Sequence, residues 1–192
     1  MTANAPVQSP ESHDPPGDQQ LIAAINNSDV AAFDVLYHRH RDWVVNLAHR
    51  FTGDENLALD VMQETFLYLL RKFPGFKLTA NLKTFLYPAV KNLSIAARQK
   101  AGRVQSTEGE QQLLEQLAST EIPLAFSSDL SAALANLSLE HREVILLRFV
   151  DDLTMAEIAT ATNVPTGTVK SRLHNALAAL RQDKRARDFF ES

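Results

Sequence analysis

The sequence contains no cysteine and only six glycines among its 192 residues. Without cysteine, the chain cannot form disulfides, bind zinc through thiolates or use a thiol nucleophile. No glycine-rich motif that would cradle a phosphate group is present. No apolar run approaches the roughly 20 residues that a membrane-spanning helix needs, and the N-terminus lacks the basic and apolar segments of a secretory signal. We therefore expect a cytoplasmic protein without membrane insertion.

Constellations of catalytic or metal-binding residues are also missing. The six histidines are scattered and form no HExxH arrangement. Asp60 and Glu64 have the i, i+4 spacing of possible metal ligands, but no second acidic helix or histidine pair accompanies them. The sequence therefore predicts no catalytic residues, no metal site and no cofactor, and we interpret the protein as not an enzyme.

Hydrophobic residues make up 45% of the chain, which is enough to build packed cores. They recur at helical spacing, and no useful stretch alternates with the period of a strand. The sequence predicts an all-α protein with two helical domains joined by a flexible acidic linker. By composition we expect a disordered N-terminal tail (1–24), a first domain (25–103), the linker (104–128), a second domain (129–185) and a C-terminal tail (186–192).

Capping and breaking residues predict where the helices begin and end. Ser28 or Asp29 can cap the first helix, and Gly53 ends it. Pro88 lies inside the predicted third helix, where a proline removes a backbone hydrogen bond, so we expect a kink there or two helices. The expected helices are 29–53, 54–72, 81–100, a short one at 110–117, 129–136 and 138–150.

The segment Leu153–Leu173, LTMAEIATATNVPTGTVKSRL, predicts a helix-turn-helix. Thr154 and Glu157 can form a capping box at the start of its first helix. Pro165 and the residues before it break that helix, and Thr166 is suited to cap the next.

The second helix of this motif combines an apolar stripe with a polar and basic face. The stripe comprises Val169, Leu173, Ala176, Leu177 and Leu180, and the opposite face carries Thr168, Ser171, His174 and Asn175, flanked by Lys170 and Arg172. Two short helices also occur in many all-helical proteins that bind no DNA. From 166 to 187, however, six basic residues stand against one acid. This local surplus favours a helix that enters a DNA groove.

The helix expected at 54–72 presents Asp60, Gln63, Glu64 and Leu67 on one face. An exposed Leu67 would need cover by a partner, which would make this face an interface. Alternatively, the polar residues are simply solvated and Leu67 packs on the next helix. The spacing alone favours this second interpretation.

The chain resembles the extracytoplasmic-function sigma factors of the bacterial sigma-seventy family over 29–103 and 129–182. LANLSLEHREVILLRFVDDLTMAEIATATNVPTGTVKSRL is similar to the family's region four, and DVMQETF (60–66) is similar to the region-two helix that docks on the polymerase clamp. The resemblance implies that the protein binds the clamp and flap regions of core RNA polymerase and directs promoter recognition. It assigns Asp60, Gln63, Glu64 and Leu67 to polymerase binding, which reverses the preference drawn from spacing. It leaves open whether an anti-sigma factor is a further partner.

The resemblance also implies two grips on promoter DNA. The first domain would handle the minus-ten element and capture an unstacked base, for which strand separation needs phosphate contacts and stacking. Phe76 or Phe85 could stack, although core packing is the better expectation for Phe85. The minus-ten residues would be Phe76, Lys77, Asn81, Lys83, Asn92, Arg98, Lys100 and Arg103. The minus-thirty-five residues would be Thr166, Thr168, Lys170, Ser171, Arg172, His174 and Asn175.

Four positions depart from the family's usual residues. Phe85 replaces a usual tryptophan, Pro88 a basic or polar residue, Ala96 an aspartate and Asn175 an arginine. We expect these changes to affect promoter melting and sequence preference. Two other functions fit parts of the sequence. These are a helix-turn-helix transcription regulator that acts without being a sigma subunit, and a protein-interaction module.

Overall fold

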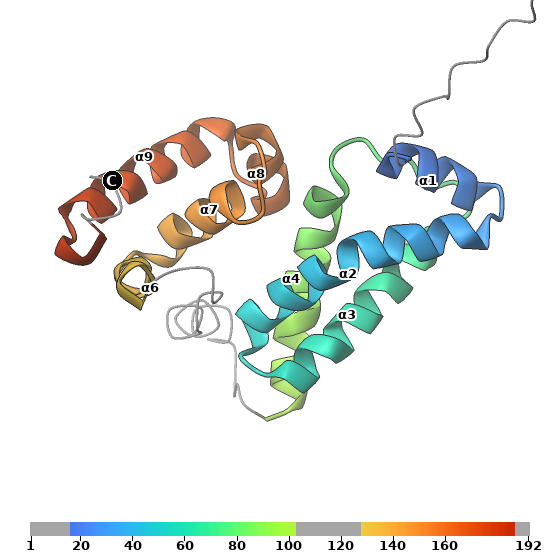
Figure 1. Ribbon diagram of the computed structural model, residues 1–192, viewed down its shortest axis with the longest axis horizontal. Helices are drawn as coiled ribbons and strands as arrows, with labels where there is room; N and C mark the ends of the chain where they lie inside the picture. Colours follow the sequence, from blue (N-terminus) through green and yellow to red (C-terminus); the bar gives the residue numbers. More distant parts are fainter. Residues whose placement is uncertain (1–15, 103–127, 187–192) are drawn as a thin grey trace, which may run out of the picture.

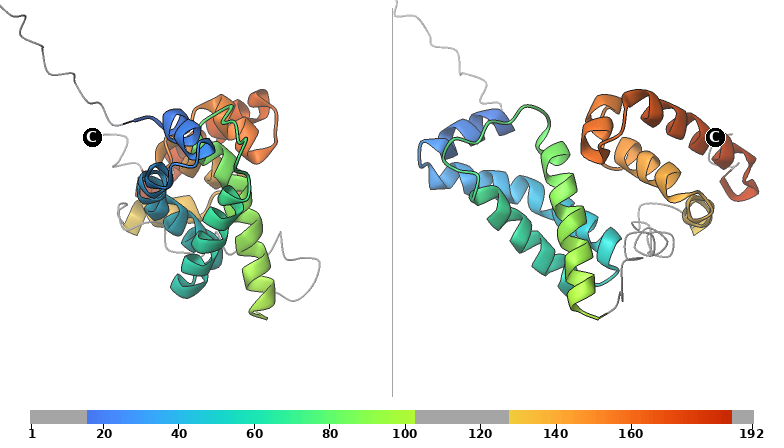
Figure 2. Two further views of the ribbon diagram at one scale, coloured as in Figure 1. Left: turned by 90° about the vertical axis from the view of Figure 1, so that its right-hand side faces the viewer. Right: turned by 180° about the vertical axis from the view of Figure 1, so that it is seen from behind.

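The structure is a computed structural model that describes residues 16–102 and 128–186. These residues form eight α-helices and no β-strand, which confirms the all-α prediction. Figure 1 shows two groups of helices, α1–α4 and α6–α9, with α8 lying beside α4. The view from behind in Figure 2 shows the same arrangement. The expected linker and its short helix at 110–117 lie outside the described residues.

The first helix, α1 (Asp18–Asn26), packs on α2 (Val30–Thr52). The predicted disordered tail extends to residue 24, and for 18–24 this prediction is wrong. Leu21, Ile22 and Ile25 are buried against the bundle. A nine-residue helix is marginal in isolation, so α1 depends on this tertiary packing rather than on its own propensity.

Caps set both ends of α2 and the start of α3 (Glu55–Leu70), and those of α2 are the ones that the sequence predicts. The Asp29 carboxylate accepts a hydrogen bond from the Ala32 amide at 3.2 Å. Gly53 adopts φ 64°, a left-handed conformation that ends α2 and favours glycine. Asp54 then caps α3 by accepting from the Leu57 amide at 2.9 Å. These two helices lie side by side, joined by a turn of two residues.

Helix α4 (Leu82–Lys100) runs through Pro88 without interruption. Of the two alternatives expected at Pro88, two separate helices are excluded, whereas a kink within one helix stays a prediction. An interior proline costs roughly 3 kcal/mol. Leu86, Tyr87 and Val90 are all at most 2% exposed, and their burial on both sides of the proline offsets that cost. Pro88 itself lies on the exposed side of the helix.

The second group contains α6 (Ser128–Ala135), α7 (Leu139–Phe149), α8 (Met155–Thr162) and α9 (Thr166–Gln182). Arg142 of α7 is only 2% exposed. Its guanidinium donates to the carbonyls of Leu134, Ala135 and Leu137 at 2.8, 2.5 and 3.2 Å. These carbonyls lie at and just after the C-terminal end of α6, where no intrahelical donor remains for them. Arg142 thereby fastens α6 to α7.

The two groups of helices share one hydrophobic core. Leu47 and Phe51 of α2 belong to the same buried cluster as Val144, Leu147 and Leu153 of the second group. The sequence predicts two domains but gives no sign of this shared packing. We call the polar contacts along this boundary the interdomain seam; it consists of Trp43, Arg50, Lys83, Tyr87 and Lys91 on the first domain and Glu143 and Asp151 on the second.

Asp151 is the centre of the interdomain seam and is only 1% exposed. Its carboxylate accepts two hydrogen bonds from Arg50, at 2.7 and 2.8 Å, and one from the Trp43 indole at 2.7 Å. Lys83 donates to the Asp151 carbonyl at 2.9 Å. The buried carboxylate is therefore both charge-paired and hydrogen-bonded, as burial of a charge requires.

A second polar contact lies further along the interdomain seam, where Tyr87 donates a hydrogen bond to the Glu143 carboxylate. Burial, followed by the charge of Glu143, raises the pKa of Tyr87 well above its usual value. The hydroxyl is therefore protonated at neutral pH and remains a donor. Lys91 lies 3.4 Å from the same carboxylate.

Candidate nucleic-acid interface

The helix-turn-helix forms as its local chemistry predicts. The Thr154 amide donates to the Glu157 carboxylate at 2.8 Å, and the Glu157 amide donates to the Thr154 hydroxyl at 3.3 Å, which completes the capping box. Asn163 ends α8 with φ 55°, in the left-handed conformation. The N-cap of α9 is Pro165, without a side-chain hydrogen bond, so the expectation that Thr166 caps this helix was wrong.

One face of α9 is buried and the other is open. Val169, Ala176 and Leu180 are at most 3% exposed, and Leu173 and Leu177 pack against the core, so the predicted apolar stripe is confirmed. The face expected to read DNA is exposed at five of its seven positions, and Thr168 and Arg172 are half-buried. The five exposed residues are Thr166, Lys170, Ser171, His174 and Asn175.

The two cations expected to grip phosphates differ in their surroundings. Lys170 is exposed, and no ion pair to it is found among the described residues. Arg172 has a side chain that is 26% exposed and lies 3.8 Å from the Glu140 carboxylate of α7. Ser171 donates to the Thr168 carbonyl at 2.9 Å, which leaves its oxygen able to accept. Lys170 is therefore the more available cation of the two.

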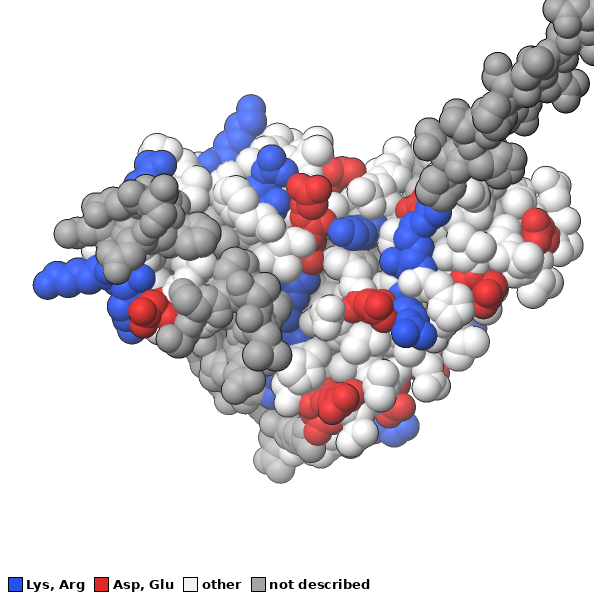
Figure 3. Space-filling model, viewed as in Figure 1, with Lys and Arg blue, Asp and Glu red and all other residues white. Residues whose placement is uncertain are grey.

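Further basic residues follow at the C-terminal end of α9. Arg185 hydrogen-bonds to Asp183 and lowers the pKa of that carboxyl to about 2, so Asp183 is ionised and neutralises this cation. Figure 3 shows basic side chains along α9, whereas acidic and basic groups alternate over the first domain. On the face seen in Figure 3, positive charge therefore gathers near α9.

The minus-ten residues expected in the first domain gather around the loop between α3 and α4 and along α4. Lys77, Asn81, Asn92 and Lys100 are exposed. The Asn81 side chain also caps α4 by accepting from the Lys83 amide at 2.9 Å. Arg103 lies outside the described residues.

The two candidate stacking rings lie against each other. Phe76 and Phe85 have ring centroids 4.7 Å apart, and both are half-buried. Phe73 approaches Phe76 at 5.6 Å, and Tyr68 stacks on Phe85 at 5.9 Å. The four rings form an aromatic cluster at the base of the α3–α4 loop.

Two of the expected DNA-binding cations are turned inward. Arg98 is 6% exposed and donates to the Phe51 carbonyl at 3.1 Å, so in this conformation its guanidinium holds α4 to α2 rather than facing solvent. Lys83 is half-buried in the interdomain seam. Burial of this kind depends on tertiary packing, which charge patterns in the sequence do not show.

The polar face predicted for α3 is present. Asp60, Gln63, Glu64 and Leu67 are exposed, while residues between them, such as Val61 and Thr65, are buried. Leu67 is 44% exposed, so it does not pack into the bundle as the alternative interpretation required. Sequence reasoning missed two further exposed apolar residues of α3, Leu59 and Leu70. A shallow groove beside this face is lined by α4, where Ala96 and Ala97 form part of the wall.

Within 16–102 and 128–186, no helix is long and apolar enough to cross a membrane. The same residues contain no group of three or more histidine, aspartate or glutamate side chains arranged to hold a metal ion.

Two family models match the sequence, one in each domain. Sigma-70 region 2 matches residues 36–104, and sigma-70 region 4 matches residues 133–182. The sequence is 35% identical over 158 residues to the ECF RNA polymerase sigma factor SigL of Mycobacterium tuberculosis, covering 80% of this chain and 89% of that protein. It is 28% identical over 180 residues to the ECF sigma factor SigW of Bacillus subtilis, covering 87% and 96% of the two chains.

Solved structures share the fold. CnrH, in complex with the cytosolic domain of CnrY, aligns with a TM-score of 0.59 at 22% identity, over 84% of this chain and 93% of that one. The sigma factor RpoE of Bartonella quintana, in complex with the anti-sigma factor NepR, aligns with a TM-score of 0.56 at 22% identity, over 80% and 96%. The two family models and the 35% identity to SigL establish that the chain belongs to the extracytoplasmic-function (ECF) RNA polymerase sigma factors.

Proposed function

We propose that this sigma factor binds core RNA polymerase through α3 and holds promoter DNA through two separate surfaces. One is the exposed face of α9 for the minus-thirty-five element. The other is the α3–α4 loop with the exposed residues of α4 for the minus-ten element. The observation that carries the proposal is the two-sided character of α9, whose apolar face is buried while its polar and cationic face remains open.

The polymerase surface of α3 combines carboxylates with exposed leucines. Leu59, Leu67 and Leu70 are 40, 44 and 39% exposed. Together with Asp60 and Glu64 they give the helix an apolar and acidic outer face. Exposed apolar side chains gathered on one helix are typical of a protein-binding surface. We propose that the clamp of the polymerase covers this face and that the flap contacts the second domain.

Phosphodiester chemistry in this proposal belongs to the polymerase, so the sigma factor itself needs no active site. Because core polymerase and promoter DNA lie in the bacterial cytoplasm, we place the protein there. RpoE aligns with this chain in a complex with the anti-sigma factor NepR, and CnrH aligns in a complex with the cytosolic domain of CnrY. We therefore propose an anti-sigma factor as a further partner.

The test is run-off transcription by purified core polymerase with this protein, on genomic fragments footprinted by the reconstituted holoenzyme. We expect promoter-dependent transcripts that core polymerase alone does not make. Retained duplex binding without any such transcript would instead indicate a helix-turn-helix regulator. Loss of both activities would indicate a protein-interaction module.

The α3 surface is tested with Asp60→Lys combined with Glu64→Lys. Replacing two carboxylates of the proposed contact surface by cations should weaken core-polymerase affinity about tenfold, because it removes the charge complementarity of that interface. Duplex binding through α9 should stay unchanged. The matched control is Asp34→Lys with Asp42→Lys, which reverses two carboxylates of α2 whose side chains are 71 and 79% exposed. Equal polymerase affinity of both double variants would refute the assignment.

A further inference from the structure

A single side chain of α1 holds the loop between α3 and α4. The Oδ1 atom of Asn26 accepts hydrogen bonds from the amides of Gly75 at 2.6 Å and Phe76 at 3.1 Å. Its Nδ2 atom donates to the Phe76 carbonyl at 2.8 Å. Asn26 thus satisfies both backbone groups of Phe76 across a sequence separation of 50 residues.

The loop has little else to fix its backbone. Within the described residues, 74–80 make no hydrogen bond to another backbone group. Gly75 has φ 99°, in the left-handed region that glycine favours, so the chain turns sharply at the residue before Phe76. An amide is well suited to hold such a turn, because it offers two acceptor lone pairs and two donors on one planar group.

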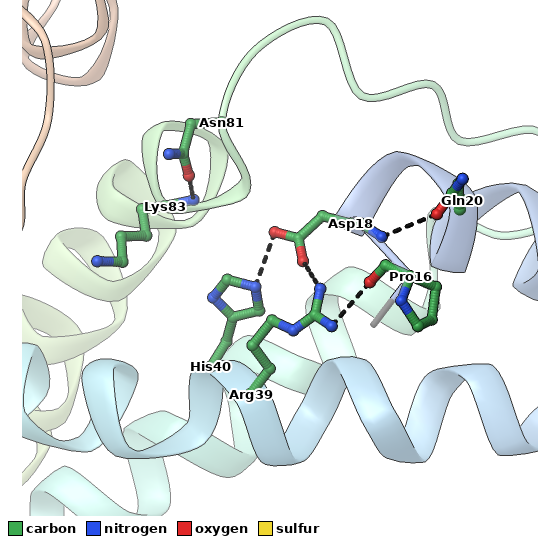
Figure 4. A network of polar contacts seen from close by, with 8 residues as sticks. Pro16, Asp18, Gln20, Arg39, His40, Asn81 and Lys83 are labelled. Atoms are coloured by element: carbon green, nitrogen blue, oxygen red, sulfur yellow. Dashed lines mark hydrogen bonds and ion pairs between the residues drawn. The ribbon is translucent and has the colours of Figure 1, made fainter. Parts of the chain in front are cut away.

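Asn26 stands on a helix that is itself anchored. The Asp18 carboxylate near the start of α1 accepts hydrogen bonds from Arg39 at 2.7 Å and from His40 at 2.8 Å (Figure 4). Burial raises the pKa of Asp18, but the hydrogen bonds from His40 and Arg39 outweigh it and lower the pKa below its usual value. Arg39 also donates to the Pro16 carbonyl at 2.7 Å. The polar end of α1 is therefore tied to α2, and its apolar residues are buried.

The ring of Phe76 packs on its neighbours in the aromatic cluster. It lies 4.7 Å from Phe85 and 5.6 Å from Phe73. With its ring packed on these neighbours and its backbone bonded to Asn26, Phe76 has one defined position at the start of the exposed segment that includes Lys77. These contacts favour a single conformation of the loop in the absence of DNA.

We propose that Asn26 is a positioning residue that preorganises the α3–α4 loop for capture of an unpaired nucleotide of the minus-ten element. The inference rests on the proposed function, since it assumes that this loop meets separated DNA strands. A preordered loop avoids the loss of conformational entropy on binding, which corresponds to about a tenfold factor in affinity for each residue that would otherwise have to be ordered. Asn26 itself needs no contact with DNA.

The experiment compares Asn26→Ala, Asn26→Asp and Asn27→Ala in the full chain, each reconstituted with core polymerase. Aspartate keeps the acceptor for the two amides but loses the donor to the Phe76 carbonyl. Asn27 is the matched control, because it is the neighbouring amide and, among the described residues, its side chain bonds within its own segment, to the Ala23 carbonyl at 3.1 Å. The probes are a promoter duplex footprinted by the wild-type holoenzyme and the same duplex with a mismatched, pre-opened minus-ten region.

We expect Asn26→Ala to reduce open-complex formation on the intact duplex about tenfold, with Asn26→Asp between it and the wild type. Asn27→Ala should match the wild type. On the pre-opened template, Asn26→Ala should form the open complex at nearly the wild-type rate, because melting is no longer required. The complex that it forms there should dissociate faster than the wild-type complex. Core-polymerase affinity and the thermal unfolding midpoint should change little.

Three results would overturn the inference. The first is open-complex formation by Asn26→Ala at the wild-type rate. The second is a loss of core-polymerase affinity in Asn26→Ala as large as its loss of open-complex formation, which would reveal a general folding defect. The third is the same rate of open-complex formation in Asn26→Asp and Asn26→Ala. Failure of the proposed function gives a different result, because the wild-type protein would then make no promoter-dependent transcript.

Discussion

At the scale of single residues, burial separates cations that the sequence treats alike. Lys170 and Arg98 were both expected to contact phosphates. Lys170 is exposed, whereas Arg98 is buried and donates to a backbone carbonyl. A cation that contacts a phosphate releases a condensed counterion from DNA, and for this its side chain must be exposed. The salt dependence of DNA binding therefore distinguishes an exposed cation such as Lys170 from a buried one such as Arg98.

Lys170→Ala should lower duplex affinity and reduce the slope of log affinity against log salt by about 0.9. Arg172→Ala should have a smaller effect, because Glu140 lies 3.8 Å from its guanidinium and already offsets part of its charge. Binding isotherms at several salt concentrations measure both slopes. Glu140→Gln provides a matched test, since removal of this carboxylate should increase the contribution of Arg172. An unchanged slope for Lys170→Ala would show that α9 does not face the phosphates.

At the scale of helices, capping residues predict where a helix begins and ends, but they do not predict features that depend on tertiary packing. Asp29, Gly53 and Thr154 mark helix ends as expected, because each acts on backbone groups a few residues away. The choice of one helix over two at Pro88 and the existence of α1 could not be predicted in this way. Both depend on burial against helices that are distant in sequence, and local rules do not include that energy.

The candidate surfaces follow the same division. The polar residues on the exposed faces of α3 and α9 were predictable, because helical periodicity places them opposite an apolar stripe. The exposure of Leu67 was not, since spacing alone favoured its packing on the next helix. The role of Asn26 was not predictable, since its partners Gly75 and Phe76 lie about fifty positions away. The interdomain seam was equally hidden, because nothing in the sequence relates Asp151 to Arg50.

The corner between α6 and α7 depends on Arg142, which is 2% exposed. Arg142→Ala should destabilise the second domain by about 3 kcal/mol, because it leaves buried carbonyls without a charged donor. Unfolding in urea measures the loss, and amide exchange should show the largest increase in α6. Arg148→Ala is the control on the same helix, with a side chain that is 38% exposed. Equal stability of the two variants would contradict this role.

At the scale of the whole molecule, the docked domains are too compact to hold both promoter elements at once. Elements centred near positions minus ten and minus thirty-five are separated by about 85 Å of duplex, at about 3.4 Å per base pair. A compact chain of about 150 residues has a radius of gyration of only about 15 Å. The interdomain seam also occupies Lys83, an expected minus-ten contact. Promoter binding by both domains therefore requires the interdomain seam to open.

We expect Asp151 to control how readily that opening occurs. In Asp151→Ala, the Arg50 guanidinium would stay buried without its carboxylate, at a cost of about 3–5 kcal/mol. Separation of the domains returns Arg50 to water and avoids most of this cost. We therefore expect an increased radius of gyration in small-angle scattering, with helical content unchanged, and tighter binding to a duplex that carries both promoter elements.

Asp152→Ala is the control for this prediction. The side chain of Asp152 is 94% exposed, and its carboxylate lies 3.8 Å from the Arg148 guanidinium. That variant should keep the wild-type radius of gyration and DNA affinity. A docked, wild-type-sized Asp151→Ala protein would show that the shared apolar core, including Leu147 and Leu153, holds the domains together without the buried ion pair. The polar contacts of the interdomain seam would then select the docked orientation and contribute little to its stability.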